Sequence, residues 1–304
     1  MSNSHRKTWF ITGASAGFGH AFASYALEKG YNVVATARNP SKLESLVAQA
    51  PGRVLALTLD VDRPHDAEAA VSAAVERFGR IDVLINNAGY AIVGAVEETP
   101  DTELRALIET NFFGAVTVIK AALPALRAQR SGAIVNISSL GGQLSFAGFG
   151  AYSASKFALE GLSEALAQEV ATFGIKVLLV EPGNFRTNLL GSGTREMPVM
   201  DAYRLSVGGT REFARGMHGA QIGDPLKAAA AIDLALEAEK TPLRLQLGED
   251  AVTAVRAHAK TMLEDLENWQ QVAVNTRIDG AAVTTKPLAA QDGLTAPSTR
   301  HRSE

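Results

Sequence analysis

Short apolar runs alternate along the chain with longer segments in which apolar residues recur every three or four positions. The short runs are nearly continuous in hydrophobic character, which is typical of strands that are buried on both faces of a sheet. The longer segments have the period of helices that present one face to a core. We expect strands over residues 7–12, 32–38, 53–59, 81–86, 132–138, 175–181 and 243–247.

Helices are expected between these strands, and several have clear start or stop residues. Thr99, Pro100 and Asp101 form a helix start ahead of a long periodic segment that runs to about residue 130. Pro124 predicts a kink or break in that helix, because proline lacks the backbone N–H that a helix interior needs. The other expected helices run from the first strand to about residue 30 and over residues 39–52, 64–78, 152–172 and 224–239.

Strands separated by helices predict right-handed βαβ units and an α/β fold. We therefore expect a doubly wound, Rossmann-type architecture, with a parallel sheet of about seven strands and helices on both faces. The pattern favours a single domain over residues 1–280. Two segments break the rhythm: residues 188–223 are glycine-dotted and weakly periodic, and the polar, Thr/Pro/Ala-rich tail 281–304 is expected to be disordered.

Composition and charge exclude several kinds of site. The chain has no cysteine, which rules out disulfides, thiolate catalysis and cysteine-ligated metals. The net charge of −3 indicates neither a nucleic-acid partner nor an anionic membrane surface. The N-terminus lacks a signal peptide and no run approaches the ~18 apolar residues of a membrane span, so we expect a cytoplasmic protein. The six histidines show no paired metal spacing, so no catalytic metal is expected.

The turn between the first strand and the following helix, Thr12 to Gly19, contains three glycines. Glycine lets a backbone turn tightly and approach a pyrophosphate without a Cβ in the way. The helix start beyond the turn offers unpaired N–H groups and a partial positive charge to such an anion. The turn therefore predicts a dinucleotide-binding loop, and an ordinary strand–helix turn is the alternative on this pattern alone.

The spacing of these glycines, GxxxGxG after Thr12, resembles that of the short-chain dehydrogenase/reductase family. Further motifs similar to those of the family follow in the correct order, so that the resemblance covers about residues 7–250. It implies a single-domain oxidoreductase that transfers a hydride between a nicotinamide dinucleotide and a carbonyl or alcohol. The motifs are Asp60-Val61, Asn86-Asn87-Ala88-Gly89, Asn111, Ser138-Ser139, Tyr152-Ser153-Ala154-Ser155-Lys156 and Pro182-Gly183-Asn184-Phe185-Arg186-Thr187.

The resemblance also implies which residues bind the cofactor. Asp60 would contact the adenine, the segment 86–89 would support the sheet and cover the adenine ribose side, and Thr187 would bond the nicotinamide carboxamide. Thr187 as a plain helix N-cap is the alternative. The expected set is Gly13, Ser15, Gly17, Phe18, Gly19, Arg38, Asp60, Val61, Asn87, Ala88, Gly89, Tyr152, Lys156, Pro182, Gly183 and Thr187.

The end of the second strand favours NADP(H) over NAD(H). Folds that prefer NAD usually place an acid there to bind the ribose 2′-OH, whereas this strand ends at Arg38. A guanidinium suits a 2′-phosphate, and Ser15 could add a hydroxyl contact. A solvated surface cation is the alternative for Arg38. Many NADP-preferring relatives also carry a basic residue in the glycine turn, where this chain has Ala16, so we expect a moderate preference.

Tyr152 and Lys156 are four residues apart on one expected helix, so their side chains share a face. A free tyrosine, with a pKa near ~10, is a poor base at neutral pH, and an adjacent ammonium favours its phenolate. The two residues therefore predict a tuned proton donor and acceptor, and a surface Tyr and Lys is the alternative.

The resemblance gives each residue of this centre a role. Tyr152 would protonate the carbonyl oxygen, and Lys156 would also hold the nicotinamide ribose. Ser139 would donate to the substrate oxygen, with neighbouring Ser138 as the second candidate. Asn111, unfavourable in mid-helix, would open the helix and bind a water that relays protons to the lysine. An exposed helical asparagine is the alternative.

The family places its substrate lid where residues 188–223 lie. Apolar residues there and after Ser139 predict a lipophilic ketone, aldehyde or alcohol, unless they only pack the lid against the body. Arg186 and Arg195 leave room for an anionic substrate. The apolar residues are Leu144, Phe146, Phe149, Leu189, Leu190, Met197, Met200, Tyr203, Phe213 and Met217.

The length beyond the sixth strand and residues 242–248 resemble the 17β-hydroxysteroid-dehydrogenase-like and retinol-dehydrogenase-like branch. In many relatives the helices equivalent to 101–130 and 152–172 form a dimer interface, so a homodimer or tetramer is expected unless the C-terminal extension blocks this interface. A small-molecule substrate is the other expected partner. Two other functions stay open. One is a noncatalytic NADP-binding sensor or scaffold, and the other is an epimerase or dehydratase of the related longer-chain group, whose glycine spacing differs.

Overall fold

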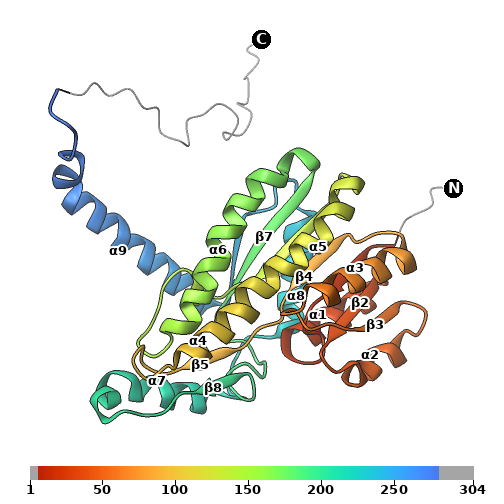
Figure 1. The fold of residues 1–304 in the computed structure, drawn as a ribbon, viewed down its shortest axis with the longest axis horizontal. Helices are drawn as coiled ribbons and strands as arrows, with labels where there is room; N and C mark the ends of the chain where they lie inside the picture. Colours follow the sequence, from red (N-terminus) through yellow and green to blue (C-terminus); the bar gives the residue numbers. More distant parts are fainter. Residues whose placement is uncertain (1–5, 281–304) are drawn as a thin grey trace. The chain divides into compact units, whose positions relative to one another are not determined.

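The computed structural model, drawn in Figure 1, describes residues 6–280. They contain a seven-stranded sheet with strand order β3-β2-β1-β4-β6-β7-β9. Every neighbouring pair in this sheet is parallel. The expected parallel sheet is therefore confirmed, and the strand bounds agree with the sequence pattern to within about two residues. The strands are β1 Thr8–Ile11, β2 Asn32–Ala37, β3 Val54–Thr58, β4 Val83–Asn86, β6 Gly132–Ile137, β7 Ile175–Pro182 and β9 Arg244–Leu247.

Helices join the strands, and most lie where the sequence pattern predicts. Asp224 caps α8 by accepting a hydrogen bond from the backbone N–H of Leu226 at 2.9 Å. α3 ends at Gly79, whose φ of 80° suits glycine at a helix end. The helices are α1 Gly17–Glu28, α2 Glu44–Gln49, α3 Pro64–Phe78, α4 Asp101–Ile108, α5 Gly114–Gln129, α6 Gly150–Val170, α7 Arg204–Met217, α8 Pro225–Glu237 and α9 Glu249–Val274.

Both faces of the sheet are covered by helices, because alternate strand residues point to opposite faces. Trp9 and Ile11 belong to a buried cluster that also contains residues of α1 and α8. Phe10, between them, belongs to a second cluster with residues of α3, α5 and α6. Two apolar layers thus enclose the sheet, as a doubly wound fold requires. The strand order reverses between β1 and β4, and ligands of such sheets bind at that point.

The long helix expected over residues 99–130 is interrupted, but not at its proline. A π-helical turn, Glu109–Phe113, separates α4 from α5, and α5 continues through Pro124. The predicted break at Pro124 is therefore wrong. A tertiary contact explains the actual position: Asn111 in the turn is buried and exchanges two hydrogen bonds with the backbone of Tyr90, at 2.9 and 3.0 Å. A π-turn inserts one extra residue and so redirects that side chain.

The segment Asp101–Gln129 is long and apolar enough to cross a membrane by length and composition alone. Helices of a protein core pass the same test, and this one contributes to the second apolar cluster of the sheet. Its buried residues there are Val118, Ile119, Ala122 and Leu126. These apolar side chains therefore pack against the sheet in the core of the fold.

Four elements have no counterpart in the sequence-based prediction. β5 (Ala91–Val93) and β8 (Thr194–Glu196) form a separate two-stranded parallel sheet, and three residues are too few to show a period. α7 lies in the segment expected to be irregular, where three glycines weaken the helical signal. α9 begins directly after Gly248 and has a largely polar sequence.

The chain divides into two units, with the boundary between His258 and Ala259. The first unit holds both sheets, α1 to α8 and the start of α9. The second unit contains the remainder of α9, and its side chains up to Gly280 are exposed. The catalytic domain expected over residues 1–280 stays a prediction, and the tail 281–304 lies outside the described residues.

Candidate active site

The carboxyl ends of the strands border a cleft of about 940 Å³. It includes the ends of β1 and β4, where the strand order reverses. Of the residues predicted for catalysis or cofactor binding, Gly19 and Asn111 lie outside its lining. The others line it: Gly13, Ser15, Gly17, Phe18, Arg38, Asp60, Val61, Asn87, Ala88, Gly89, Ser139, Tyr152, Lys156, Pro182, Gly183 and Thr187.

The glycine turn has a backbone that other residues do not easily adopt. Gly13 and Gly17 have positive φ values of 66° and 55°. A Cβ on Gly19 would lie 2.3 Å from the carbonyl oxygen of Gly13, so the turn closes only with glycine there. The N-cap residue Ala16 makes no side-chain bond to the first N–H groups of α1. These groups and the open backbone fit the phosphates of a dinucleotide.

Asn87 and Thr12 hold the glycine turn against the neighbouring strand. The Asn87 side-chain amide donates to the carbonyl oxygens of Thr12 at 2.9 Å and Gly13 at 3.2 Å. The Thr12 hydroxyl accepts the backbone N–H groups of Asn87 and Ala88 at 2.9 and 3.0 Å. The ends of β1 and β4 are therefore cross-linked, which makes the turn a preformed cradle.

Arg38 follows the last residue of β2 and lines the cleft with an exposed side chain. It makes no ion pair with any residue that the structure describes, so its guanidinium is available to an anion. Asp60 and Asp62 follow β3 and line the same region. Burial raises the pKa of Asp62, and the charge of Arg38 acts weakly in the opposite direction.

Tyr152 and Lys156 lie one turn apart on α6, and both are buried where they line the cleft. Lys156 Nζ donates to the carbonyl oxygen of Ile137 at 2.8 Å and lies 5.7 Å from the centre of the Tyr152 ring. A hydrogen bond with Ser139 lowers the pKa of the phenol. The Ser139 hydroxyl also accepts the backbone N–H of Gly141 at 3.0 Å, which fixes its position. The three expected groups are therefore brought together.

Burial is the dominant influence on this centre. It raises the pKa of Tyr152 to about 12 and lowers the pKa of Lys156 to about 8. Burial of the phenol is the largest influence on its pKa, so the expected shift of Tyr152 towards phenolate by the ammonium of Lys156 stays a prediction. At neutral pH the tyrosine is a phenol that can give a proton, and the lysine still carries its charge.

A family model described as short chain dehydrogenase matches residues 7–198, which include the glycine turn and the candidate reacting centre formed by Ser139, Tyr152 and Lys156. The chain belongs to the short-chain dehydrogenase/reductase family. It is therefore an oxidoreductase, and its residues Ser139, Tyr152 and Lys156 lie in the matched region.

Relatives of this dehydrogenase match it over most of their length. An oxidoreductase called BOA17 from Botryotinia fuckeliana is 42% identical over 269 residues, which cover 88% of this chain and 98% of the relative. A 3-ketodihydrosphingosine reductase from Bacteroides thetaiotaomicron is 40% identical over 271 residues, which cover 87% and 95%.

Solved structures of other proteins share the fold. A short-chain dehydrogenase from Streptomyces avermitilis is 51% identical with a TM-score of 0.85, over 91% of this chain and 100% of that one. ElxO, solved with NADP bound, is 27% identical with a TM-score of 0.68, over 82% and 99%. These likenesses support a nicotinamide cofactor for this dehydrogenase as well.

Asn111 of the dehydrogenase lies in the π-turn and does not line the cleft. Besides the two bonds with Tyr90, its amide donates to the hydroxyl of Ser155 at 3.0 Å. The expected local opening of the helix is confirmed, and the alternative of an exposed asparagine is wrong. The side chain holds the segment after β4 against α6, and a proton relay through it stays a prediction.

The segment after β7 is fixed by a residue that the sequence pattern did not reveal. Asp250, in the first turn of α9, accepts the backbone N–H and the side-chain amide of Asn184 at 2.7 and 2.8 Å. A Cβ on Gly183 would lie 2.2 Å from this carboxylate, so glycine permits the contact. No helix begins at Thr187, whose hydroxyl accepts the N–H of Leu189 at 3.3 Å, so the N-cap alternative is wrong.

The expected lid, residues 188–223, borders the cleft with only part of its apolar side chains. Leu189, Leu190 and Phe213 line the cleft, together with Phe146 and Phe149 from the loop after Ser139. The other expected wall residues lie outside the cleft lining. They are Leu144, Met197, Met200, Tyr203 and Met217.

Two buried carboxylates next to the reacting centre also escaped the sequence analysis. Glu160 lies one turn beyond Lys156 on α6 and raises the pKa of that lysine. Arg244 Nε lies 3.0 Å from Glu160 and 3.5 Å from Glu181, a fully buried residue of β7. Gln143, in the loop after Ser139, donates to both carboxylates at 3.1 Å. The four-residue spacing from Lys156 was the available signal for Glu160.

Glu181→Gln should make stability depend less on pH. Burial raises the pKa of Glu181 from 4.5 to about 7, so between these values the folded state holds a proton that the unfolded state has lost. The wild type therefore loses stability as the pH rises through this range. Relative to wild type, the variant should gain about 2 kcal/mol of unfolding free energy between pH 5 and pH 8 in urea denaturation.

Glu164→Gln is the control, because Glu164 pairs with the same Arg244 but its side chain is 53% exposed. It should follow the pH dependence of the wild type. If Glu181→Gln did so as well, a raised pKa for Glu181 would be excluded.

Proposed function

We propose that this dehydrogenase interconverts a carbonyl and an alcohol with NADP(H), and that Tyr152 is its proton donor and acceptor. The observation that carries the proposal is the convergence of Tyr152, Lys156 and Ser139 in the same cleft as the glycine cradle. A noncatalytic NADP-binding sensor would need the cradle but not these three groups. Their joint presence favours the enzyme.

The directions of the pKa shifts suit carbonyl reduction. A phenol whose pKa is about 12 keeps its proton at neutral pH and can pass it to a carbonyl oxygen as negative charge develops there. Ser139 can donate a further hydrogen bond to the same oxygen. Lys156, held by the carbonyl of Ile137, stabilises the phenolate that is left. When bound, a reduced nicotinamide supplies the hydride.

Arg38 supports the preference for NADP(H). Its guanidinium is exposed in the cleft at the end of β2, and this strand end carries no carboxylate that would repel a 2′-phosphate. Ser15 in the glycine turn lines the same cleft and offers a hydroxyl. The structure of ElxO with NADP bound is consistent with this choice.

Arg38→Ala should raise KM for NADPH by about tenfold or more and change KM for NADH by less than about twofold, since only NADPH loses a charged contact. Initial rates with both cofactors measure this. Arg77→Ala is the control, because that side chain is exposed on α3 and lies outside the cleft lining. Equal increases for NADPH and NADH would reject the phosphate role of Arg38.

We further propose a lipophilic substrate. Arg195 lies 4.5 Å from the centre of the Tyr90 ring and pairs with Glu103 at 2.8 Å, so its charge is already balanced. This makes an anionic substrate the weaker choice. The cleft near Tyr152 is lined by Leu140, Phe146, Phe149, Leu189, Leu190 and Phe213.

Consumption of NADPH in the presence of methyl ketones of increasing chain length, followed by absorbance, tests the reaction itself. A long-chain 3-keto amino alcohol belongs in the series, because one relative is named a 3-ketodihydrosphingosine reductase. Tight binding of NADPH without consumption on any compound would favour the sensor instead.

A further inference from the structure

α7 has two different faces, and only one of them borders the cleft. Thr210 and Phe213 line the cleft, whereas Val207, Arg211 and Ala214 are buried. The buried positions recur at helical spacing and form one stripe along the helix. The rotation of α7 about its axis therefore decides whether Phe213 faces a substrate.

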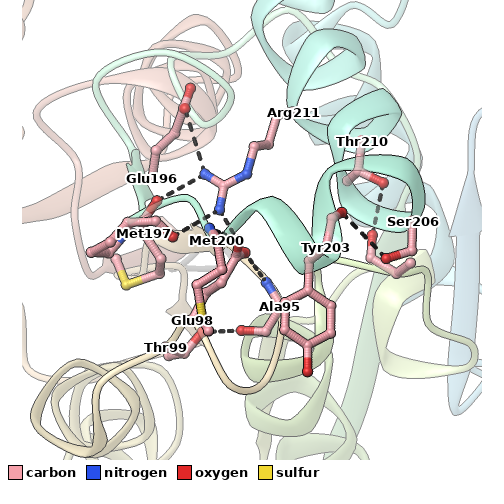
Figure 2. Close-up of polar contacts among 12 residues, drawn as sticks. Ala95, Glu98, Thr99, Glu196, Met197, Met200, Tyr203, Ser206, Thr210 and Arg211 are labelled. Atoms are coloured by element: carbon pink, nitrogen blue, oxygen red, sulfur yellow. Dashed lines mark hydrogen bonds and ion pairs between the residues drawn. The ribbon is translucent and has the colours of Figure 1, made fainter.

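Arg211 is an unusual member of a buried stripe, because a buried charge is costly unless it is paired and hydrogen-bonded. Only 6% of its side chain is exposed. Its Nη2 donates to the carboxylate of Glu98 at 2.7 Å, and its Nη1 donates to the carbonyl oxygen of Met197 at 2.9 Å (Figure 2). Glu196 lies 3.8 Å from the same Nη1.

Glu98, the partner of Arg211, is 1% exposed and bonded on both oxygens. One oxygen accepts the backbone N–H of Ala95 and the other that of Met200, each at 2.7 Å. These bonds lower the pKa of Glu98, which keeps the pair ionised at neutral pH. The carboxylate thus joins the loop after β5, the stretch after β8 and α7 at one point (Figure 2).

Both faces of α7 contact the loop that leads into α6. The Thr210 hydroxyl donates to the carbonyl oxygen of Ala147 at 2.7 Å. A Cβ on Gly148 would lie 2.9 Å from Val207, so the loop and α7 are closely packed. Because this loop continues directly into α6 and Tyr152, a displacement of α7 would also move the cleft wall next to the tyrosine.

We propose that the Glu98–Arg211 pair is the lid anchor: it fixes the rotation and depth of α7 and so positions Phe213 and Thr210 against the substrate. The inference rests on the proposed function, because it treats α7 as a wall of the substrate site. Neither charged residue lines the cleft, so both are positioning residues. Discrimination between long and short substrates then depends on an ion pair that the substrate does not touch.

The structural half of the proposal is tested by hydrogen–deuterium exchange in Arg211→Met and Glu98→Gln. Residues 196–217 should exchange about tenfold faster or more in both variants, while β1, β4 and β6 exchange as in wild type. Arg215→Met is the matched control: this arginine is one turn further along α7 and pairs with Glu196, but its side chain is 62% exposed. It should exchange as wild type does.

The functional half is tested on a chain-length series of methyl ketones. In both anchor variants, KM for the longest ketone should rise about tenfold, whereas kcat for the shortest ketone and Kd for NADPH stay within about twofold of wild type. A general loss of stability would reduce the active fraction equally for all ketones. A uniform loss over chain length would therefore overturn the positioning role.

Unchanged exchange of residues 196–217 in both variants would overturn the anchor, whatever the turnover. Selective exchange there, together with no turnover of any ketone by the wild type, would retain the anchor and reject the proposed function instead. If Arg211→Met does not fold, hydrogen exchange and the KM series of Glu98→Gln test the anchor by themselves. This variant should fold, because the glutamine side chain keeps one carbonyl acceptor and a similar volume.

Discussion

Tyr152→Phe is expected to lower kcat for carbonyl reduction by about 10²- to 10⁴-fold and to leave the Kd for NADPH within about twofold of wild type. The substitution removes only the hydroxyl that gives a proton to the substrate. Tyr152 is 8% exposed and its ring lies 6.2 Å, centre to centre, from the ring of Phe149, so phenylalanine keeps its packing. Steady-state rates and a fluorescence titration with NADPH measure the two quantities.

Tyr25→Phe is the matched control for the loss of a phenol hydroxyl. The Tyr25 hydroxyl donates to Asp233 at 3.0 Å, and neither residue lines the cleft. Turnover should be unchanged, although stability falls by about 1 kcal/mol. Turnover by Tyr152→Phe at the wild-type rate would exclude the proton-donor role, and loss of NADPH binding would assign the hydroxyl to the cofactor instead.

Gly19→Ala is expected to weaken NADPH binding by about 100-fold or more, equivalent to ~2.7 kcal/mol. Its Cβ would meet the Gly13 carbonyl oxygen at 2.3 Å and the Asn87 side-chain nitrogen at 2.6 Å. Because the first of these is a backbone atom of the turn, the cradle itself must open. Overpacking of this kind also lowers the unfolding free energy by about 1–3 kcal/mol. Calorimetric titration and thermal melting check both effects.

Gly161→Ala is the control for this substitution, because Gly161 lies within α6 and nothing comes within 4 Å of an added Cβ. Alanine is the better helix former, so this variant should bind NADPH normally and gain about 0.5–1 kcal/mol of stability. If Gly19→Ala bound NADPH as tightly as Gly161→Ala, the glycine turn could not be the phosphate cradle.

The sheet, the cradle and the reacting residues could be predicted from the sequence because their signals are local. The apolar runs of the strands are continuous, since both faces of a parallel sheet are buried. The glycines of the turn and the pair Tyr152 and Lys156 each lie within a few residues of one another. Once the strands are parallel, their carboxyl ends meet at one edge, and these separate segments necessarily converge.

Contacts between distant segments explain what the sequence pattern misses. The helix opens at Asn111 rather than at Pro124 because of hydrogen bonds to Tyr90, which belongs to the segment after β4. Asp250 meets Asn184 across 66 positions, and Arg211 meets Glu98 across 113. No local window of sequence contains both partners of such a contact.

The electrostatics of the reacting centre could be anticipated only in part. The spacing of Tyr152 and Lys156 shows that the two groups are neighbours, but it carries no information on how far each is removed from water. Burial raises the pKa of the tyrosine and lowers that of the lysine, so desolvation is the main influence on both protonation states. That balance depends on the packed fold.

Hydride transfer in this cleft is tested most directly by supplying NADPH deuterated at both C4 positions together with the methyl ketone series, and measuring deuterium in the alcohol by mass spectrometry. We predict one deuterium per alcohol, on the carbinol carbon, with the wild type, and about 10²- to 10⁴-fold less of this labelled alcohol per unit time with Tyr152→Phe. Alcohol formed without deuterium, or NADPH that is bound and never consumed, would contradict the assignment of this cleft as a carbonyl-reducing site.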